Sequence, residues 1–308
     1  MVPDARDDGR VNTAGQVRDA VVHEVERSGF RAHGLHVLVG DDTAEHHWSP
    51  DVRRDVHSVA KGVVVLAVGI AEHDGVLSLD EPVGTLLPDV TLGPGVPAVT
   101  LRHLLTMTSG IDMPWSPTET TDWPDLAREF LGRPTVGRSF RYANASTYTA
   151  ARALAARVGD VGAYVQDRLF TPLGITDVVW DRCPLGYVVA GAGLWLRTAE
   201  VARIGRLLRD RGDVDGRQLV PAGLVDAMHG DPVVAGSSPA YDRYALAGWG
   251  GPGRLWRLHG AYGQLVLLDP VADAVVTITA DDHERADATA AAVARVLADL
   301  EPVARTVT

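Results

Sequence analysis

Strand-like runs gather near the two ends of this 308-residue chain, and their placement limits the folds that the chain can adopt. Near the start, Leu35, Val37 and Val39 alternate with other residues before the turn-forming GDD, a pattern typical of a β-strand. Near the end, the runs RLWRLHG, GQLVLLDP and DAVVTITAD are separated by tight Gly and Asp-Pro turns, which predicts three consecutive antiparallel strands. A single sheet would therefore take its strands from both ends of the chain.

Helical patterns flank and separate these strands. Residues 12–28 place apolar side chains on one face at helical spacing, and an Ala-rich helix is expected over about 285–300. The middle of the chain is rich in helix signals, such as LRHLLTMTSG and NASTYTAARALAARVG. Because the strands do not alternate regularly with helices, the pattern predicts an α/β (α+β) fold: an antiparallel sheet built from both chain ends, flanked by helices, with a mostly helical inserted region.

The chain carries no Ser/Gly linker, charge block or long repeat that would divide it into separate domains. We expect one interleaved unit, with residues 12–74 and 186–308 in the sheet region and residues 75–185 in the helical region. Residues 1–11 are expected to be a flexible N-terminus.

Charge and cysteine content exclude several classes of partner. The net charge of -11 is spread along the sequence and the arginines form no basic stripe, which argues against nucleic acid or an anionic membrane. The single cysteine, Cys183, allows no intramolecular disulfide and is expected to be a small buried hydrophobic residue.

The N-terminus is polar and acidic, unlike a signal peptide, so a cytoplasmic location is expected. The apolar run over 63–71 is too short to span a bilayer and predicts a buried helix.

Lys61 is the one lysine among 29 basic residues, and it follows Ser58 by three positions in HSVAKG. In a helix this spacing places both side chains on one face, about 5 to 6 Å apart at Cβ. A serine hydroxyl becomes a good nucleophile when a neighbouring base accepts its proton, and a lysine amine can do so once burial lowers its pKa from about 10.4. Arginine cannot, because its guanidinium does not deprotonate in proteins.

The simpler interpretation is that Ser58 caps a helix and Lys61 is a surface charge. The rarity of lysine argues against it, and so does the apolar run that begins directly after Gly62.

Two further segments carry candidate site residues. In RYANAS, Tyr142 could transfer a proton and Asn144 could hold both a lysine amine and an amide carbonyl. In LHGAYGQ, the glycines around His259 would let a backbone N–H approach an acyl oxygen closely. Taken singly, Tyr142 could instead pack on the core, Asn144 could cap the following helix, and His259 could lie in a plain hairpin turn. Trp115, Trp123, Trp195 and Trp249 are candidates for the walls of a cleft, although packing explains each one alone.

Together these segments resemble the serine β-lactamase and penicillin-binding protein superfamily, and in particular its class C β-lactamase-like esterases and peptidases. The resemblance covers about residues 35 to 300 and is carried in order by HSVAKG, DEPVGTLLPD, TLRHLLTMTSGI, RYANAS, FTPLGITDVVW, GAGLWLRTAEVARIGRLL and HGAYGQLVLLDP. It implies a β-lactamase/transpeptidase-like fold.

The resemblance also implies a role for each matching residue. Ser58 would be the acylated nucleophile, Lys61 its base partner, and Tyr142 the proton shuttle for acylation and for the later attack of water. Asn144 would order Lys61 and bind the substrate amide. The remaining substrate contacts would come from His259, Gly260 and Ala261, with an oxyanion hole made by the Ser58 N–H and one N–H near residues 258–261.

One departure from the family pattern bears on the substrate. Penicillin-cleaving members carry Lys-Thr-Gly on the last of these strands, whereas this chain has His259 and Gly260 and no second lysine. The cation that would bind the carboxylate of a β-lactam is missing unless His259 or a nearby arginine replaces it. We therefore expect an esterase or amidase that acts on a small ester or amide, with specificity walls in residues 112–135 and 228–255.

Three alternatives remain open: a true β-lactamase or D-alanyl-D-alanine carboxypeptidase, an acyltransferase to an acceptor other than water, and a non-catalytic β-lactam-binding or sensor protein. No zinc, P-loop or dinucleotide motif is present, so no metal or cofactor is expected.

Overall fold

The computed structural model describes residues 13–113, 125–236, 242–251 and 253–300. The N-terminal segment 1–11, and with it the flexibility expected there, lies outside the described residues, as do Trp115 and Trp123.

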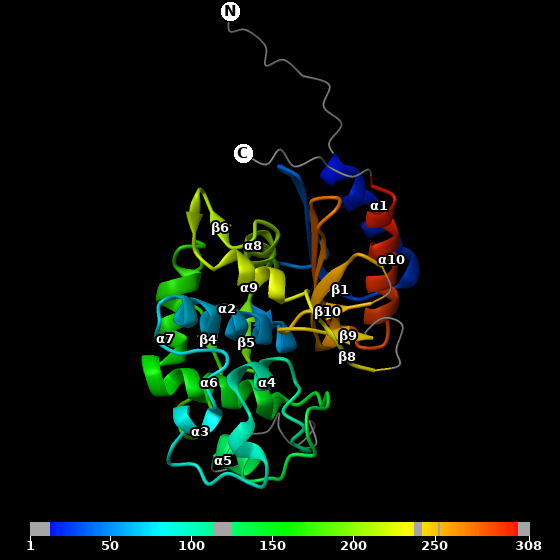
Figure 1. The fold of residues 1–308 in the computed structure, drawn as a ribbon. Helices are drawn as coiled ribbons and strands as arrows, with labels where there is room; N and C mark the ends of the chain where they lie inside the picture. The colour runs from blue at the N-terminus through cyan, green and yellow to red at the C-terminus, as the bar shows by residue number, and fades with distance from the viewer. Residues whose placement is uncertain (1–12, 114–124, 237–241, 252, 301–308) are drawn as a thin grey trace, which may run out of the picture.

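The expected architecture is confirmed: one large antiparallel sheet has helices on both sides and a helical region beside it (Figure 1). Its eight strands follow the order β2-β1-β13-β12-β11-β10-β9-β8, so the N-terminal hairpin pairs directly with the last strand of the chain. The eight strands are β1 (Ala32–Val39), β2 (Asp42–His47), β8 (Val233–Val234), β9 (Arg243–Tyr244), β10 (Trp249–Gly250), β11 (Trp256–Gly260), β12 (Gln264–Asp269) and β13 (Ala274–Ala280).

The helices divide between the faces of the sheet and the helical region. Three long helices pack on the sheet: α1 (Thr13–Ser28), α8 (Thr198–Arg209) and α10 (Ala286–Ala298). Among the described residues, the other helices are α2 (Ala60–His73), α3 (Val83–Leu86), α4 (Leu101–Leu105), α5 (Leu126–Leu131), α6 (Asn144–Val158), α7 (Val161–Val165), α9 (Ala222–Ala227), the 3-10 turns η1 (His57–Val59), η2 (Val96–Ala98) and η5 (Ala261–Gly263), and the π-helical turn η4 (Gln166–Phe170).

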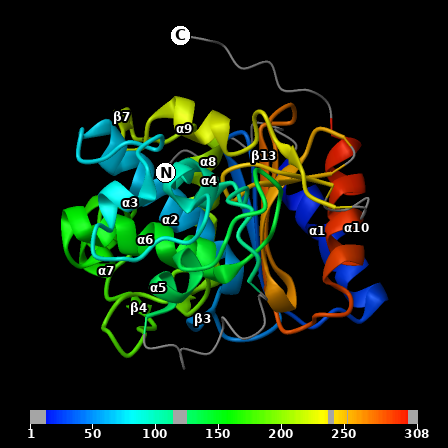
Figure 2. The same ribbon diagram turned by 60° about the horizontal axis from the view of Figure 1, so that its bottom comes forward.

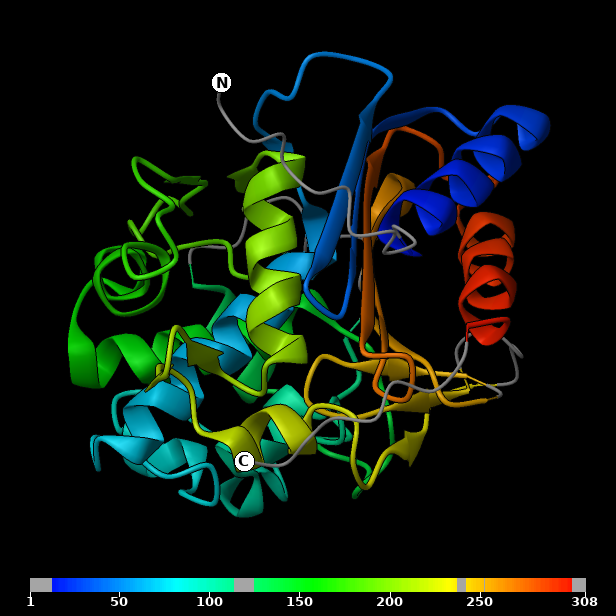
Figure 3. The same cartoon turned by 90° about the horizontal axis from the view of Figure 1, so that it is seen from above.

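Both faces of the central strands are covered. Seen from above, α8 lies on one face of the sheet and α1 and α10 lie on the other (Figure 3). Every residue of β12 and β13 is buried, because neither face meets solvent. This explains why GQLVLLDP and DAVVTITAD read as nearly continuous apolar runs and not as an alternation.

The apolar run after Lys61 forms the predicted buried helix. All residues of α2 from Ala60 to Ala71 are buried, and the helix lies between the sheet and the helical region, in contact with α6, α7 and α9 (Figure 2). A helix that is apolar on all sides is stable only when protein surrounds it. Among the described residues, no helix is long and apolar enough to cross a membrane.

Three groups of short strands have no counterpart in the sequence pattern. Strands β8, β9 and β10 extend the large sheet within residues 228–255, where the sequence pattern predicts specificity walls and no strand. A second sheet joins β3 (Arg54–Asp55), β5 (Leu194–Leu196) and β4 (Val179–Trp180), and β6 (Asp213–Val214) pairs with β7 (Arg217–Gln218). Two or three residues are too few to show a periodicity, so pairing with a distant segment decides where such strands form.

Candidate active site

Ser58 and Lys61 are placed by a 3-10 turn that runs directly into α2. Ser58 lies in η1, Lys61 lies in the first turn of α2, and the Lys61 Nζ and Ser58 Oγ atoms are 2.8 Å apart. The two residues thus face the same way, as their spacing predicts.

Lys61 is almost completely buried, with 2% of its surface exposed, and its amine has three oxygen partners. It donates to Ser58 Oγ at 2.8 Å, to Asn144 Oδ1 at 2.6 Å and to the carbonyl oxygen of Gly191 at 2.8 Å. An ammonium group has three N–H donors, which match these three acceptors. A neutral amine has two N–H groups for the two carbonyl oxygens and a lone pair for the Ser58 O–H. The same geometry therefore suits both protonation states of the amine.

Tyr142 and Asn144 reach this amine from the start of α6. Asn144 is the first residue of α6, and the extended backbone of Ala143 separates it from Tyr142. The Tyr142 and Ser58 hydroxyls share a hydrogen bond, and the Lys61 Nζ atom lies 5.0 Å from the centroid of the Tyr142 ring. Burial raises the pKa of Tyr142 to about 12, and the hydrogen bond with Ser58 acts in the opposite direction. The phenol is therefore protonated at neutral pH.

Gly191 is part of this group, and sequence reasoning missed it. A Cβ atom at this position would lie within 3.1 Å of three Asn144 side-chain atoms, so only glycine lets the carbonyl approach Lys61 beside Asn144. The segment GAGLWL belongs to the motifs that carry the family resemblance, but a backbone acceptor has no side-chain signature that would mark it.

The segment before Ser58 is tied to residues 193–200 by three alternating side chains, which the sequence analysis also missed. Asp51 accepts from the N–H of Thr198 at 2.8 Å, at the start of α8. Arg53 pairs with the buried carboxylate of Glu200 at 2.7 Å. In an extended segment, alternate residues point the same way, so the pattern D-x-R-x-D ahead of HSVAK was the available signal.

Asp55, the third of these side chains, holds the turn that carries Ser58. Its Oδ1 atom accepts from the N–H of His57 at 2.8 Å and from the N–H of Gly193 at 2.9 Å. His57 has a φ of 48°, a left-handed conformation that is uncommon for a residue with a side chain. Asp55 therefore joins the turn before Ser58 to the loop that contributes the Gly191 carbonyl.

The strand with the third motif packs tightly against this turn. A Cβ atom on Gly260 would lie 2.4 Å from the carbonyl oxygen of Val56, and one on Gly62 would lie 2.7 Å from Cδ1 of Leu258. These two glycines let β11 approach the turn and the helix that carry Ser58 and Lys61. Ala261 follows at once, as the first residue of η5.

His259 and Leu258 point to opposite faces of β11, as successive residues of a strand do. Leu258 packs against Gly62 of α2. His259 therefore faces away from α2, toward the face covered by α10, where Asp287 and His283 influence its charge. Burial lowers the pKa of His259 to about 4, and the Arg257 guanidinium acts in the same direction, so the imidazole is neutral at pH 7.

The two described tryptophans among the possible cleft walls lie in different surroundings. Trp249 is partly buried, and its ring centroid lies 5.4 Å from that of Tyr142. Trp195 is 38% exposed, and its indole N–H donates to Asp181. Trp249 is thus next to the group around Ser58.

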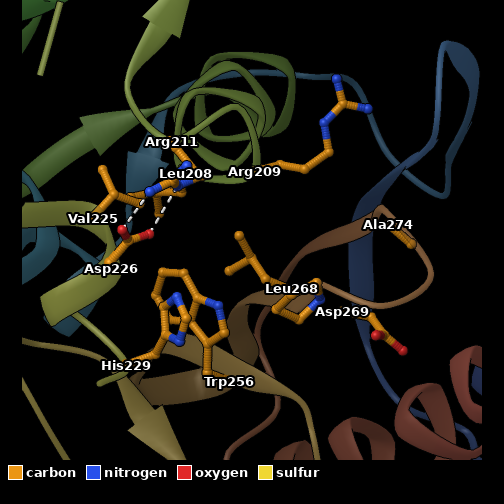
Figure 4. Close-up of a pocket in the computed structure, with 11 residues that line it drawn as sticks. Leu208, Arg209, Arg211, Val225, Asp226, His229, Trp256, Leu268, Asp269 and Ala274 are labelled. Carbon is orange, nitrogen blue, oxygen red and sulfur yellow. Dashed lines mark hydrogen bonds and ion pairs between the residues drawn. The ribbon is translucent and has the colours of Figure 1, made fainter. Parts of the chain in front are cut away.

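A separate cavity of about 220 Å³ lies between α8, α9 and the strands β11 and β12 (Figure 4). His229 stacks on Trp256 there, with ring centroids 4.9 Å apart, and Arg211 pairs with Asp226 at 2.5 Å. Ser58, Lys61, Tyr142 and Asn144 are not among its lining residues. Within the described ranges, no three His, Cys, Asp or Glu side chains are grouped closely enough to hold a metal ion.

Comparison with known proteins gives a family and a fold. The sequence model of the family described as Beta-lactamase matches residues 14–300. A search of curated protein sequences finds no match.

Among solved structures, a class C beta lactamase from Rhodobacter sphaeroides superposes with a TM-score of 0.71 at 17% identity, covering 94% of this chain and 99% of that one. A D-amino acid amidase from Ochrobactrum anthropi SV3, complexed with L-phenylalanine amide, gives 0.72 at 16% identity, covering 94% and 98%. The octameric penicillin-binding protein homologue from Pyrococcus abyssi gives 0.75 at 16% identity, covering 94% and 78%. At these identities the likeness establishes the fold.

Proposed function

This chain belongs to the beta-lactamase family, and from that premise we propose that it is a serine hydrolase that forms an acyl-enzyme on Ser58 from a small ester or amide. The observation that carries the proposal is the buried Lys61 amine, held between Ser58 Oγ, Asn144 Oδ1 and the Gly191 carbonyl. A base held in this way accepts the serine proton without moving.

The reaction has two stages, acylation of Ser58 and hydrolysis of the acyl-Ser58 ester. The Ser58 Oγ atom forms a bond to the substrate carbonyl carbon while the Ser58 proton passes to Lys61. When the bond from that carbon to the leaving oxygen or nitrogen breaks, Tyr142 gives its proton to the leaving atom and regains one from Lys61. Water then attacks the acyl-Ser58 ester, and its proton returns through the same pair to Ser58 Oγ. The overall reaction consumes one water and releases an acid and an alcohol or amine.

The negative charge on the carbonyl oxygen in each step requires N–H donors. Ser58 lies at the start of a helical segment, where the first N–H groups have no partner within the helix. The Ser58 N–H and one N–H of residues 258–261 would bind this oxygen, since Gly260 brings the end of β11 close to the Ser58 turn.

The environment of β11 supports a substrate that needs no carboxylate. Leu258, an apolar residue, is the side chain that β11 presents to α2, and His259 is neutral at pH 7. Neither supplies the cation that would bind the carboxylate of a penicillin or a cell-wall peptide. An ester or amide without that carboxylate is therefore favoured over a β-lactam.

The test is the intact-protein mass over time after mixing with a p-nitrophenyl ester or, separately, with a penicillin. We expect wild type to show a transient adduct and continuing turnover with the ester, and Ser58→Ala to show neither. Turnover of the penicillin by wild type would identify a β-lactamase, and a stable penicillin adduct would identify a penicillin-binding protein. Undiminished ester turnover by Ser58→Ala would overturn the role of Ser58.

A further inference from the structure

Four aromatic rings form one continuous group beside the Ser58 hydroxyl: Phe140, Tyr142, Tyr244 and Trp249, here called the aromatic platform. The ring of Tyr142 lies 5.4 Å from that of Trp249 and 6.0 Å from that of Tyr244. Phe140 extends the group, with its ring 5.4 Å from Tyr244 and 6.0 Å from Trp249. Such separations are typical of rings in direct contact.

The platform has a buried base and a partly exposed surface. Tyr244 is 1% exposed, whereas Phe140, Tyr142 and Trp249 each keep part of their surface open to solvent. Partly exposed aromatic rings that touch one another are apolar surface that a planar group can cover.

The sheet holds this surface in a fixed position. Trp249 of β10 pairs directly with Tyr244 of β9, and their rings are 4.6 Å apart. On its other side, Trp249 pairs with Arg257 of β11, the strand whose end approaches the Ser58 turn. The platform is therefore built before substrate arrives, so binding to it requires little ordering of the protein.

The position of Tyr142 decides which part of the substrate would lie on the platform. Three oxygen atoms accept hydrogen bonds from the buried Lys61 amine. Tyr142, in contrast, is partly exposed and shares a hydrogen bond with Ser58. Of these two groups, Tyr142 is the one that can reach the leaving atom. The rings that continue from Tyr142 would therefore lie next to the leaving group and not next to the acyl group.

Resting on the proposed function, we infer that the aromatic platform binds the leaving group of the substrate, and that the enzyme prefers esters or amides of apolar, planar alcohols or amines. The preferred substrates then carry an aromatic ring on the alcohol or amine side of the scissile bond.

The test compares two isomeric esters, benzyl acetate and methyl phenylacetate, which carry the same ring on opposite sides of the scissile bond. Each kcat/KM is divided by the rate constant of uncatalysed alkaline hydrolysis, so that intrinsic reactivity cancels. We expect wild type to prefer benzyl acetate by roughly tenfold or more, the range typical of one apolar group in a fitted pocket.

Substitutions of the platform residues test whether the platform causes the preference for benzyl acetate. Trp249→Leu keeps an apolar side chain but removes the planar ring, and we expect it to reduce the preference for benzyl acetate roughly tenfold. Phe140→Leu provides a second test if Trp249→Leu folds poorly, which thermal unfolding will reveal. Trp195→Leu is the matched control, because it makes the same change at an exposed tryptophan outside the platform, and we expect it to keep the wild-type preference.

Each outcome separates the inference from the proposed function. If both isomers acylate Ser58 and are hydrolysed without preference, or if methyl phenylacetate is preferred, the hydrolase stands and the leaving-group assignment is wrong. The assignment also fails if folded Trp249→Leu and Phe140→Leu keep the full preference. If wild type forms no adduct and turns over neither isomer nor the p-nitrophenyl ester, the proposed function itself fails.

Discussion

Gly191 lies against the side chain of Asn144 so closely that a Cβ atom on Gly191 would be 3.0 Å from Oδ1 and 3.1 Å from Cβ and Cγ of Asn144. The carbonyl oxygens of both residues accept hydrogen bonds from Lys61. The position of the amine therefore depends on a contact between two segments that are distant in the sequence.

Replacing Gly191 with alanine should displace Asn144 or the Gly191 carbonyl and so move the Lys61 amine relative to Ser58. We expect Gly191→Ala to lower kcat by about 100-fold, since displacements near 1 Å have effects of this size. Steady-state kinetics on the ester measures it. Gly223→Ala is the matched control, because a Cβ atom there meets nothing within 4 Å, and wild-type kinetics for Gly191→Ala would contradict the prediction.

Replacing Lys61 with arginine keeps a positive charge but removes the group that can release its proton. We expect Lys61→Arg to lower kcat/KM by about 10² to 10⁴, the usual contribution of a general base. Because Lys61 is only 2% exposed, the larger guanidinium can also disturb packing. Lys61→Met, which has similar length and no charge, separates the two effects, and near-normal turnover by either folded variant would refute the proton-acceptor role.

The raised pKa of Tyr142 predicts a loss of stability in alkaline solution. Burial raises the pKa of Tyr142 to about 12, although the hydrogen bond with Ser58 lowers it, whereas the unfolded chain has the ordinary value near 10. As the pH rises, the unfolded state releases this proton first. The stabilisation is therefore complete below about pH 10 and is lost between about pH 10 and 12.

Urea unfolding of wild type and Tyr142→Phe at about pH 9 and about pH 11.5 measures this effect. We expect the free energy of unfolding to fall more for wild type than for the variant, since the remaining tyrosines are common to both. Equal decreases would show that the Tyr142 phenol ionises as it does in the unfolded chain.

Removing the Asp55 carboxylate should weaken the connection between the Ser58 turn and the Gly191 loop. Asp55→Ala leaves the N–H groups of His57 and Gly193 without their acceptor, at a cost of about 1 to 3 kcal/mol of stability for each that stays buried. We also expect kcat to fall roughly tenfold or more, because the turn that carries Ser58 can then shift.

Asp55→Asn tests whether this role is positional, because the amide keeps an oxygen that can accept both N–H groups. We expect Asp55→Asn to recover most of the activity lost in Asp55→Ala, with Asp89→Ala as the control for removing an exposed carboxylate. If Asp55→Asn is as inactive as Asp55→Ala, the charge of Asp55 matters and not its oxygen.

Most of the fold could be predicted from the sequence because its long elements carry their own patterns. The helices α1, α2 and α10 and the strands β1, β11, β12 and β13 each contain enough residues to show a periodicity or a continuous apolar run. The short strands β3, β4 and β5 do not, since two or three residues adopt an extended pairing only when a partner segment is present.

The residues of the candidate site also fall into two groups, those that a local sequence pattern marks and those that it does not. HSVAKG marks Ser58 and Lys61 because both the rarity of lysine and the helical spacing are local features, and the order of motifs added Tyr142 and Asn144. Asp55 and Gly191 escaped notice because their contributions are contacts with distant backbone atoms.

By itself, the sequence determined the family resemblance, the long strands β1, β11, β12 and β13 of the large sheet and the placement of Ser58 and Lys61 one helical turn apart, since each shows as a pattern along the chain. Only the tertiary structure decided that the Gly191 carbonyl binds Lys61, that Leu258 and not His259 faces α2, and that three further aromatic rings form one group with Tyr142. Those contacts join segments up to about 200 residues apart. Strand pairing and close packing determine them, and a single sequence does not encode such contacts as a local pattern.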